Sequence, residues 1–438
     1  MGIEKKWVVK EQGNPASVRQ LAQELGIDQV LANLLVQRGI DTFAKAREFF
    51  RPDLGMLHDP FLMKDMDKAV ERLHRAITGG EKILVYGDYD VDGTTAVSLV
   101  YSFIKRYSPN VDFYIPDRYD EGYGVSEKGI NYADDGGFTL IITLDCGIKA
   151  IDKTRLAASR GIDVIVCDHH LPEEELPPAV AVLDPKREDD TYPFDDLCGC
   201  GVGFKLVQGY AQKYDIPFDA LRPLLDLLVV SISSDLVTMV DENRVLAYFG
   251  LKRLNDDPCK GLLAMINLSN LEPGHITIDD IVFKIGPRIN AAGRMETGRL
   301  AVELLTATET GKAMIVGEKI NNNNNERKNV DREITAEALE MVETINTANE
   351  AETFDSAPVL AKLQELETDP EHARFLNTDK YYVAGFLGSE AKENITLCLE
   401  GGMQGSKEYA GIGYDEEDYL SDSKRSEERR VGKECRSR

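Results

Sequence analysis

The 438-residue sequence contains no run of 18 or more apolar residues, so it predicts no membrane-spanning helix. Its first residues, MGIEKKWVVKEQGNP, lack the apolar core of a secretory signal peptide. Cysteine is sparse, and the seven scattered cysteines do not have the spacing of a disulfide scaffold. Cys198 and Cys200 could form a metal or redox pair, but two small buried residues in a Gly-rich turn are the favoured interpretation. We therefore expect a reduced, cytoplasmic protein with no membrane partner.

A surplus of basic charge is missing too, since the formal net charge is −25 at pH 7. Nucleic-acid-binding proteins usually present a basic face, and the net charge alone argues against that class. The acidic excess is uneven, however, because residues 341–420 hold 17 acidic and 5 basic side chains. Acidic residues elsewhere in the chain can serve as metal ligands, so the net charge does not decide the function.

The pattern of apolar residues divides the chain into regions. Residues 1–75 have the three-and-four spacing of amphipathic helices, whereas residues 76–310 open with short apolar runs separated by helical patterns. This alternation predicts an α/β fold in which a parallel sheet is flanked by helices, followed by a mainly helical second part. Residues 311–345 predict a long connector helix that includes five consecutive asparagines. Residues 346–438 form an atypical region whose basic end, 424–438, is expected to be unstructured or non-native.

An aspartate follows each of the five apolar runs, which are KILVYGD, VDFYIPD, TLIITLDCG, DVIVCDHH and AVAVLDP. These residues are Asp88, Asp117, Asp145, Asp168 and Asp184. Open parallel sheets bind ligands outside the carboxyl ends of their strands, where these side chains would gather. Aspartate also caps helices and turns, and we favour that structural role for Asp117 and Asp184. A purely structural role explains the complete set of five aspartates poorly.

Further metal-capable side chains accompany these aspartates. Asp90 and Asp92 stand at alternate positions after the first run, where an extended loop would turn both toward one metal site. His169 and His170 follow the fourth run. Carboxylates combined with imidazole suit Mn²⁺ or Mg²⁺ better than structural zinc. The number of carboxylates indicates two divalent ions, about 3.5–4 Å apart, of the kind that hydrolyse phosphodiesters.

Six segments, in order, resemble motifs of the DHH phosphoesterase superfamily and, within it, of the RecJ single-strand-specific exonucleases. GDYDVDG, LDCGI and CDHH are similar to the first, third and fourth motifs of the superfamily. IPDRYDEGYGVS, SISSDLVTMVDENRVLAYFGL and KIGPRINAAGR are similar to further RecJ segments. The resemblance covers residues from about 20 to 345 and implies the DHH phosphoesterase fold, with residues 76–310 as the catalytic domain.

The resemblance also implies a role for each matching residue. It implies that six residues bind the metal ions, with the aspartate of the third motif as the bridge between two ions. These residues are Asp88, Asp90, Asp92, Asp145, His169 and Asp235. It implies a catalytic set of His170, Asp145 and Asp168, in which His170 faces the scissile phosphate and Asp168 orients ligands. Contacts to substrate are implied for Arg118, Tyr123, Gly124, Ser126, Arg288, Asn290 and Arg294. Arginine suits this task because its planar fork pairs with phosphate oxygens.

The family resemblance implies a metal-dependent 5′-to-3′ exonuclease of single-stranded DNA in repair and recombination, with a single-strand-binding protein and a helicase as partners. One departure bears on this expectation. RecJ chains carry a Gly-Gly-His motif and then a DNA-gripping OB-fold after the connector helix, whereas here Gly401 and Gly402 precede Met403. A phosphodiesterase for short oligonucleotides or cyclic dinucleotides would not need that grip. A catalytically silent RecJ-like scaffold is a third hypothesis, although such relatives lose metal ligands and every ligand position is filled here.

Overall fold

The computed structural model describes residues 10–235 and 237–350, and for residues 341–350 it describes the backbone alone. A compact unit ends at residue 327. The expectations for residues 351–438, including the non-native tail and the departure at Gly401, lie outside the described residues.

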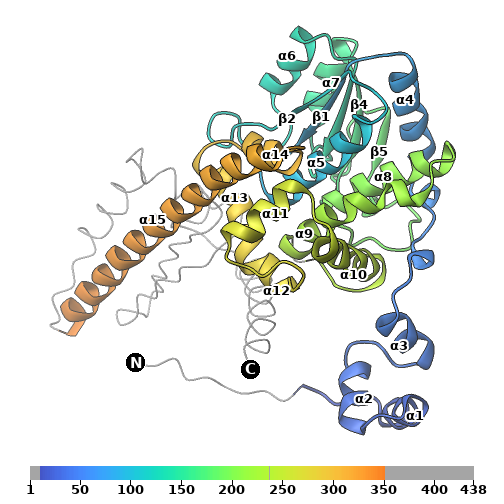
Figure 1. Cartoon of the computed structure of the whole chain (residues 1–438), viewed down its shortest axis with the longest axis vertical. Helices are drawn as coiled ribbons and strands as arrows, with labels where there is room; N and C mark the ends of the chain where they lie inside the picture. The colour runs from blue at the N-terminus through green and yellow to red at the C-terminus, as the bar shows by residue number, and fades with distance from the viewer. Residues whose placement is uncertain (1–9, 236, 351–438) are drawn as a thin grey trace. The chain divides into compact units, whose positions relative to one another are not determined.

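Five strands in the described part of the chain form one parallel sheet, in the order β2-β1-β3-β4-β5 (Figure 1). They are β1 (Ile83–Gly87), β2 (Val111–Tyr114), β3 (Leu140–Leu144), β4 (Asp163–Cys167) and β5 (Ala181–Leu183). The five apolar runs of the sequence form these strands, so the predicted parallel sheet is confirmed. The strand order reverses between β1 and β3, and open sheets bind their ligands at such a point.

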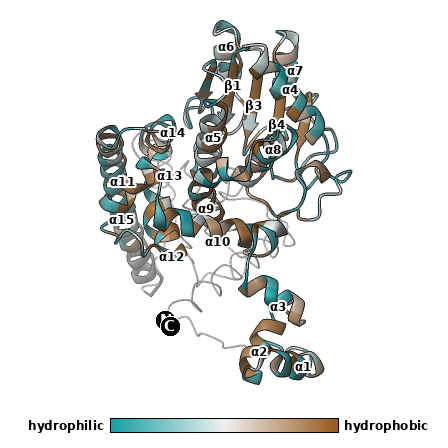
Figure 2. Cartoon of the chain, turned by 45° about the vertical axis from the view of Figure 1, so that its right-hand side comes forward, coloured by the Kyte–Doolittle hydropathy of each residue, from teal (hydrophilic) through white to brown (hydrophobic). Residues whose placement is uncertain are grey.

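Both faces of the sheet are covered by helices. On one face α4 (Met66–Thr78), α5 (Val91–Ile104) and α8 (Gly199–Lys213) bury a core that takes in Ile83 and Val85 of β1. On the other face α6 (Glu127–Asp135) and α7 (Ile151–Ser159) cover the alternate residues Leu84 and Tyr86. Figure 2 accordingly shows the central strands as mainly hydrophobic. Burial on both faces explains why the strands read as continuous apolar runs rather than as an alternating pattern.

The second part of the compact unit is helical, as predicted. It contains α9 (Leu225–Ser234), α10 (Asp241–Asp256), α11 (Lys260–Leu268), α12 (Ile278–Asp280), the π-helical η5 (Ile281–Ile285), α13 (Gly286–Met295) and α14 (Arg299–Leu305). The helix α15 (Thr310–Glu350) includes the predicted connector and continues through the five asparagines. Short 3₁₀ turns are η1 (Leu54–Met56), η2 (Pro60–Leu62), η3 (Phe218–Ala220) and η4 (Arg222–Leu224).

The N-terminal region consists of α1 (Pro15–Leu25), α2 (Gln29–Val36) and α3 (Phe43–Phe50), which share a small core of their own. The predicted helices of this region are confirmed, whereas the domain boundaries drawn at residues 75, 310 and 345 stay predictions. Among the described residues no helix is both long and apolar enough to span a membrane.

Candidate active site

The aspartates that follow β1, β3 and β4 emerge side by side at the carboxyl end of the sheet. The strand register pairs Gly87 with Leu144, and Leu144 with Cys167, so the next residue of each strand occupies the same level. Those next residues are Asp88, Asp145 and Asp168. The apolar strands therefore deliver three carboxyl groups to the reversal point of the sheet.

The extended loop expected for the other two carboxylates of the first motif is correct for Asp90, whose backbone is extended, but wrong for Asp92. Asp90 is the N-cap of α5 and accepts a hydrogen bond from the backbone N–H of Gly93 at 2.9 Å. Asp92 lies within the first turn of α5 and is buried. Adding a Cβ to Gly93 would place it 2.5 Å from the carbonyl oxygen of Asp88, so the tight entry into the helix requires glycine.

Asp145 lies in a left-handed conformation, with φ of 59°, immediately after β3. Asparagine and aspartate tolerate this region better than other residues with a Cβ, and the turn aims the buried carboxyl group at the helices opposite. Gly199 of α8 packs against it so closely that an added Cβ would lie 2.6 Å from the Asp145 Cβ. The backbone N–H of Asp145 continues the sheet by donating to the Cys167 carbonyl at 3.0 Å.

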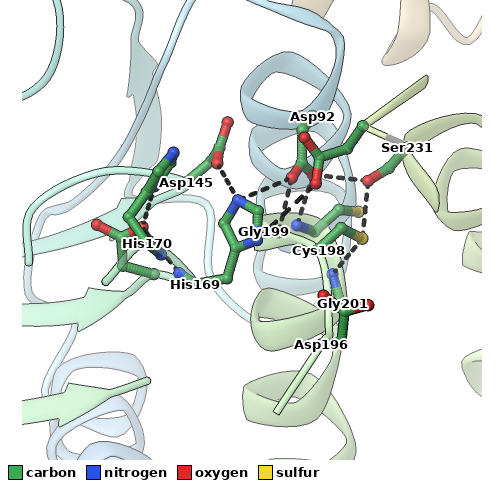
Figure 3. Close-up of polar contacts among 12 residues, drawn as sticks. Asp92, Asp145, His169, His170, Asp196, Cys198, Gly199, Gly201 and Ser231 are labelled. Carbon is green, nitrogen blue, oxygen red and sulfur yellow. Dashed lines mark hydrogen bonds and ion pairs between the residues drawn. The ribbon is translucent and has the colours of Figure 1, made fainter. Parts of the chain in front are cut away.

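The two adjacent histidines have different surroundings. His169 is 7% exposed, and its Nε2 lies 3.1 Å from Asp145 Oδ1 and 3.8 Å from Asp92 Oδ2 (Figure 3). Its Nδ1 lies 3.8 Å from Asp235 Oδ2 and makes no hydrogen bond with any described residue. The side chain of His170 is 44% exposed, and its Nδ1 contacts Asp168 Oδ1 at 2.8 Å.

Asp168 organises the backbone around these histidines. Its Oδ1 accepts hydrogen bonds from the backbone N–H groups of His169 at 2.8 Å and His170 at 3.3 Å. Its Oδ2 accepts from the N–H of Ile148 at 2.9 Å, beyond β3. With both oxygens used in this way, Asp168 positions its neighbours. It belongs to none of the ligand groups described next.

Three overlapping groups of carboxylate and imidazole atoms occur among the described residues, each compact enough to hold one cation. They are Asp88 with Asp90 and Asp145, then Asp92 with His169 and Asp235, then Asp145 with His169 and His170. Asp145 and His169 each belong to two groups, so two neighbouring ions could share a ligand. Carboxylate oxygen with imidazole nitrogen is a donor set for Mn²⁺ or Mg²⁺. The buried, unsatisfied Nδ1 of His169 also fits a metal-binding role.

Crowding of the carboxyl groups perturbs their protonation. Burial, followed by repulsion from Asp92 and Asp90, raises the pKa of Asp145 well above its usual range. The same causes raise the pKa of Asp235 to about 8, and burial with repulsion from Asp92 raises that of Asp90. Burial lowers the pKa of His169, which leaves the imidazole neutral and able to act as a ligand. Cations would replace the protons of this cluster.

His170 titrates in the opposite direction from His169. Burial acts to lower its pKa, but the hydrogen bond and the charge of Asp168 outweigh burial and raise it. Correspondingly, the pKa of Asp168 is lowered: burial acts to raise it, yet the contact with His170 prevails. His170 therefore carries a proton more readily than an ordinary histidine. Nδ1 contacts Asp168 at 2.8 Å, and Nε2 lies 3.4 Å from the Tyr123 hydroxyl.

The remaining strand-end aspartates have the structural roles that the sequence favoured. Asp117 accepts hydrogen bonds from the N–H groups of Tyr119 and Asp120, in a turn after β2. Asp184 is buried after β5 and accepts from the N–H of Lys186 at 2.9 Å. Burial raises the pKa of Asp184 to about 7. Neither aspartate belongs to a ligand group among the described residues.

Helix α13 packs directly on the loop between β1 and α5. A Cβ on Gly293 would lie 2.3 Å from the carbonyl oxygen of Tyr89, which forms part of the GDYDVDG motif. Arg288 on the same helix is half-buried, with Nε donating to Asn321 Oδ1 at 2.9 Å and Nη1 to the Lys284 carbonyl at 2.7 Å. The π-helical turn η5 just before α13 is a feature frequent at functional sites.

The other substrate residues implied by the family resemblance lie in two segments. The Asn290 side-chain oxygen of α13 is buried without a hydrogen bond to the described residues, and the Arg294 carbonyl accepts from Tyr119 at 2.7 Å. The Arg118 guanidinium lies 4.7 Å from the centre of the Tyr89 ring. The Tyr123 hydroxyl donates to the Asp145 carbonyl at 3.1 Å, which places this exposed ring beside the cluster.

Two members of the predicted substrate set are engaged in holding their own loop. The carbonyl of Gly124 accepts from the Tyr86 hydroxyl at 2.9 Å. The hydroxyl of Ser126 donates to Glu121 and accepts from the N–H of Gly129 as the N-cap of α6. Direct substrate contacts of Gly124 and Ser126 therefore stay predictions, as do those of the arginines.

Sequence reasoning missed the groups behind Asp92. Ser231 of α9 donates to its Oδ1 at 2.6 Å, and the N–H of Gly199 donates to its Oδ2 (Figure 3). The N–H of Cys200 also donates to its carboxylate. The favoured interpretation of Cys198 and Cys200 as small buried residues is confirmed, although they begin a helix rather than lie in a turn. The only sequence signal was the glycine-rich start of α8.

Comparisons with known proteins agree with this geometry. Residues 82–232 match the model of the DHH family, N-terminal domain. The chain is 41% identical over 326 residues to the single-stranded-DNA-specific exonuclease RecJ of Bacillus subtilis, a match that covers 74% of this chain and 41% of the relative. It is 33% identical to the RecJ exonuclease of Escherichia coli, over 73% of this chain and 57% of the relative. The chain thus spans about half the length of these curated relatives.

Solved structures show the same relationship. A crystal structure of exonuclease RecJ bound to manganese is 27% identical and superimposes with a TM-score of 0.60, covering 66% of this chain and 72% of that chain. RecJ from Thermus thermophilus in complex with Mn²⁺ shares the fold, with a TM-score of 0.65 at 24% identity, over 75% of this chain and 46% of that chain.

Proposed function

The chain is a relative of the RecJ exonucleases with a DHH family domain at residues 82–232, and we propose that it is a metal-dependent exonuclease of single-stranded DNA. The observation that carries the proposal is the set of three overlapping ligand groups, whose side chains come from the carboxyl ends of β1, β3 and β4, from α5 and from the end of α9. The proposal includes digestion from the 5′ end, a role in DNA repair and recombination, and a cytoplasmic location. The proposal also includes two protein partners, a single-strand-binding protein and a helicase.

The proposed mechanism begins with the residues that would hold the ions. Asp88, Asp90 and Asp145 would hold one ion, and Asp92, His169 and Asp235 the other. When bound there, divalent cations lower the pKa of a coordinated water and offset charge on the phosphate. The neutral His169 has Nε2 beside Asp92 and Nδ1 beside Asp235, so it can bind a cation without adding positive charge.

The remaining steps belong to side chains of the chain itself. His170, whose pKa Asp168 raises, would present Nε2 to the phosphate and give a proton to the leaving oxygen. Arg288 has Nε and Nη1 occupied by Asn321 and Lys284, so it would meet a phosphate oxygen through Nη2. The Arg118 guanidinium lies over the Tyr89 ring and would contact the DNA strand there.

The test is degradation of a labelled 30-nucleotide single-stranded DNA (a 30-mer) in the presence of Mn²⁺. A 5′ label should be released at once as a mononucleotide, while a 3′ label should shorten gradually. Asp145→Ala should abolish the activity, because it removes a member of two ligand groups. Asp152→Ala, which removes an exposed aspartate at the start of α7, is the matched control and should keep the activity.

The same assay separates the alternatives. Faster hydrolysis of a dinucleotide than of the 30-mer would favour the small-substrate phosphodiesterase. Full activity of Asp145→Ala would refute the assigned site. Hydrolysis of neither substrate, together with calorimetry that shows no Mn²⁺ binding, would favour the scaffold.

A further inference from the structure

Asp92 is held from behind by three hydrogen-bond donors that belong to two other helices. Its Oδ2 accepts from the backbone N–H of Gly199 at 2.6 Å. Its Oδ1 accepts from the hydroxyl of Ser231 at 2.6 Å (Figure 3). The same oxygen accepts from the N–H of Cys200 at 2.7 Å. We propose that Ser231 is a positioning residue of the metal site, which acts through Asp92. This inference rests on the proposed function and deepens its metal-binding step.

The direction of the hydrogen bonds follows from the chemistry of the groups. The Ser231 hydroxyl has a single proton and lies near two acceptors, Asp92 Oδ1 at 2.6 Å and Cys198 Sγ at 3.0 Å. A carboxylate is the stronger acceptor, so the proton points to Asp92. The Cys198 thiol can then donate to the serine oxygen, while its sulfur accepts from the N–H of Gly201 at 3.3 Å. The N–H of Gly201, the thiol of Cys198, the hydroxyl of Ser231 and the carboxylate of Asp92 thus form one hydrogen-bonded series, in which each group donates to the next and Asp92 is the final acceptor.

This hydrogen-bonded series fixes the direction in which the Asp92 carboxylate points. Asp92 Oδ2 lies 3.8 Å from His169 Nε2, and Asp92 shares a ligand group with His169 and Asp235. Without donors behind it, the Asp92 side chain would be free to rotate away from His169. Asp92, Ser231 and Cys198 are almost completely buried, so water cannot replace a lost donor cheaply.

The position of α8 couples both sides of the site. Its first turn supplies two of the N–H donors to Asp92, and Gly199 in that turn also packs against the Cβ of Asp145. Ser231 joins α9 to this arrangement. Groups that orient metal ligands in this way typically contribute a factor of about 10–100 to metal affinity.

The experiment measures Mn²⁺ binding to the full chain by calorimetry, which is independent of nuclease activity. Ser231→Ala should weaken Mn²⁺ binding about ten-fold. Ser233→Ala is the matched control: it removes a buried hydroxyl of the same helix that makes no hydrogen bond to the described residues. We expect Ser233→Ala to stay within about two-fold of the wild type.

Ser231→Cys enlarges the side chain only slightly but supplies a much weaker donor, so it carries the test if the alanine variant does not fold. We expect Ser231→Cys to bind Mn²⁺ several-fold more weakly than the wild type. Wild-type affinity in the Ser231 variants would overturn the inference, as would equal weakening by Ser233→Ala. A wild-type chain that binds Mn²⁺ but leaves DNA intact would refute the proposed nuclease and not this inference.

Discussion

Replacement of Asp235 by asparagine should stabilise the metal-free protein, because this carboxyl group is held in a repulsive cluster. Its pKa is raised to about 8 in the folded protein from an ordinary 3.8. A carboxyl group that keeps its proton in the fold at pH 7, but loses it on unfolding, costs the folded state about 4 kcal/mol. The side chain is 27% exposed and shares protons with its neighbours, so we expect about half of that, ~2 kcal/mol.

The sign of the pH dependence follows from the raised pKa. Below the unfolded pKa of 3.8 the group is protonated in both states and costs nothing. The folded state then loses stability as the pH rises toward 8, and asparagine, which does not titrate, avoids this loss. The advantage of Asp235→Asn should therefore be near zero close to pH 4 and largest near pH 8.

Urea unfolding in EDTA, at a series of pH values, measures this advantage. Asp152→Asn, which changes an exposed aspartate outside the cluster, should show none. Addition of Mn²⁺ should then make the wild type more stable than Asp235→Asn. An ion at one hundred times its dissociation constant adds about 2.7 kcal/mol to the free energy of unfolding of the wild type. The variant lacks one ligand and should gain less. A variant that is no more stable than the wild type in EDTA at pH 7 would refute the reasoning.

Three further outcomes are expected. The affinity for Mn²⁺, measured by calorimetry, should rise between about pH 6 and 8, and binding should release protons, because the raised pKa values of the cluster keep protons on the ligands. An affinity that does not change with pH would contradict this expectation. Gly293→Ala should lower the free energy of unfolding by about 1–3 kcal/mol and reduce DNA hydrolysis, whereas Gly311→Ala, where nothing lies within 4 Å of the new methyl group, should do neither. Asn321→Ala should raise KM for a 30-mer several-fold with little change in kcat, because it releases Arg288, and the exposed neighbour Asn322→Ala should not.

The predictable part of the site was the part that local sequence determines. A continuous apolar run fixes where each strand ends, and the rule for parallel sheets then places Asp88, Asp145 and Asp168 at one edge. The turn role of Asp117 followed equally from local chemistry. The extended loop assumed for Asp92 failed because Asp90 caps a helix that begins at the next residue.

The unpredictable part depends on how helices that are distant in sequence pack together. The donors to Asp92 lie 107, 108 and 139 residues further along the chain, and no local pattern relates Ser231 to it. The contact between Arg288 and Asn321 likewise joins helices α13 and α15 through two residues that are 33 positions apart in the sequence. The asparagine run was predicted only to continue a helix, yet one of its members binds an arginine of α13.

Anomalous diffraction from a crystal of the protein soaked with Mn²⁺ tests the central claim most directly. We predict two manganese peaks, one among Asp88, Asp90 and Asp145 and the other among Asp92, His169 and Asp235. Crystals of Asp145→Ala should lose at least the first peak. Manganese bound elsewhere on the chain, with none between these side chains, would contradict the account.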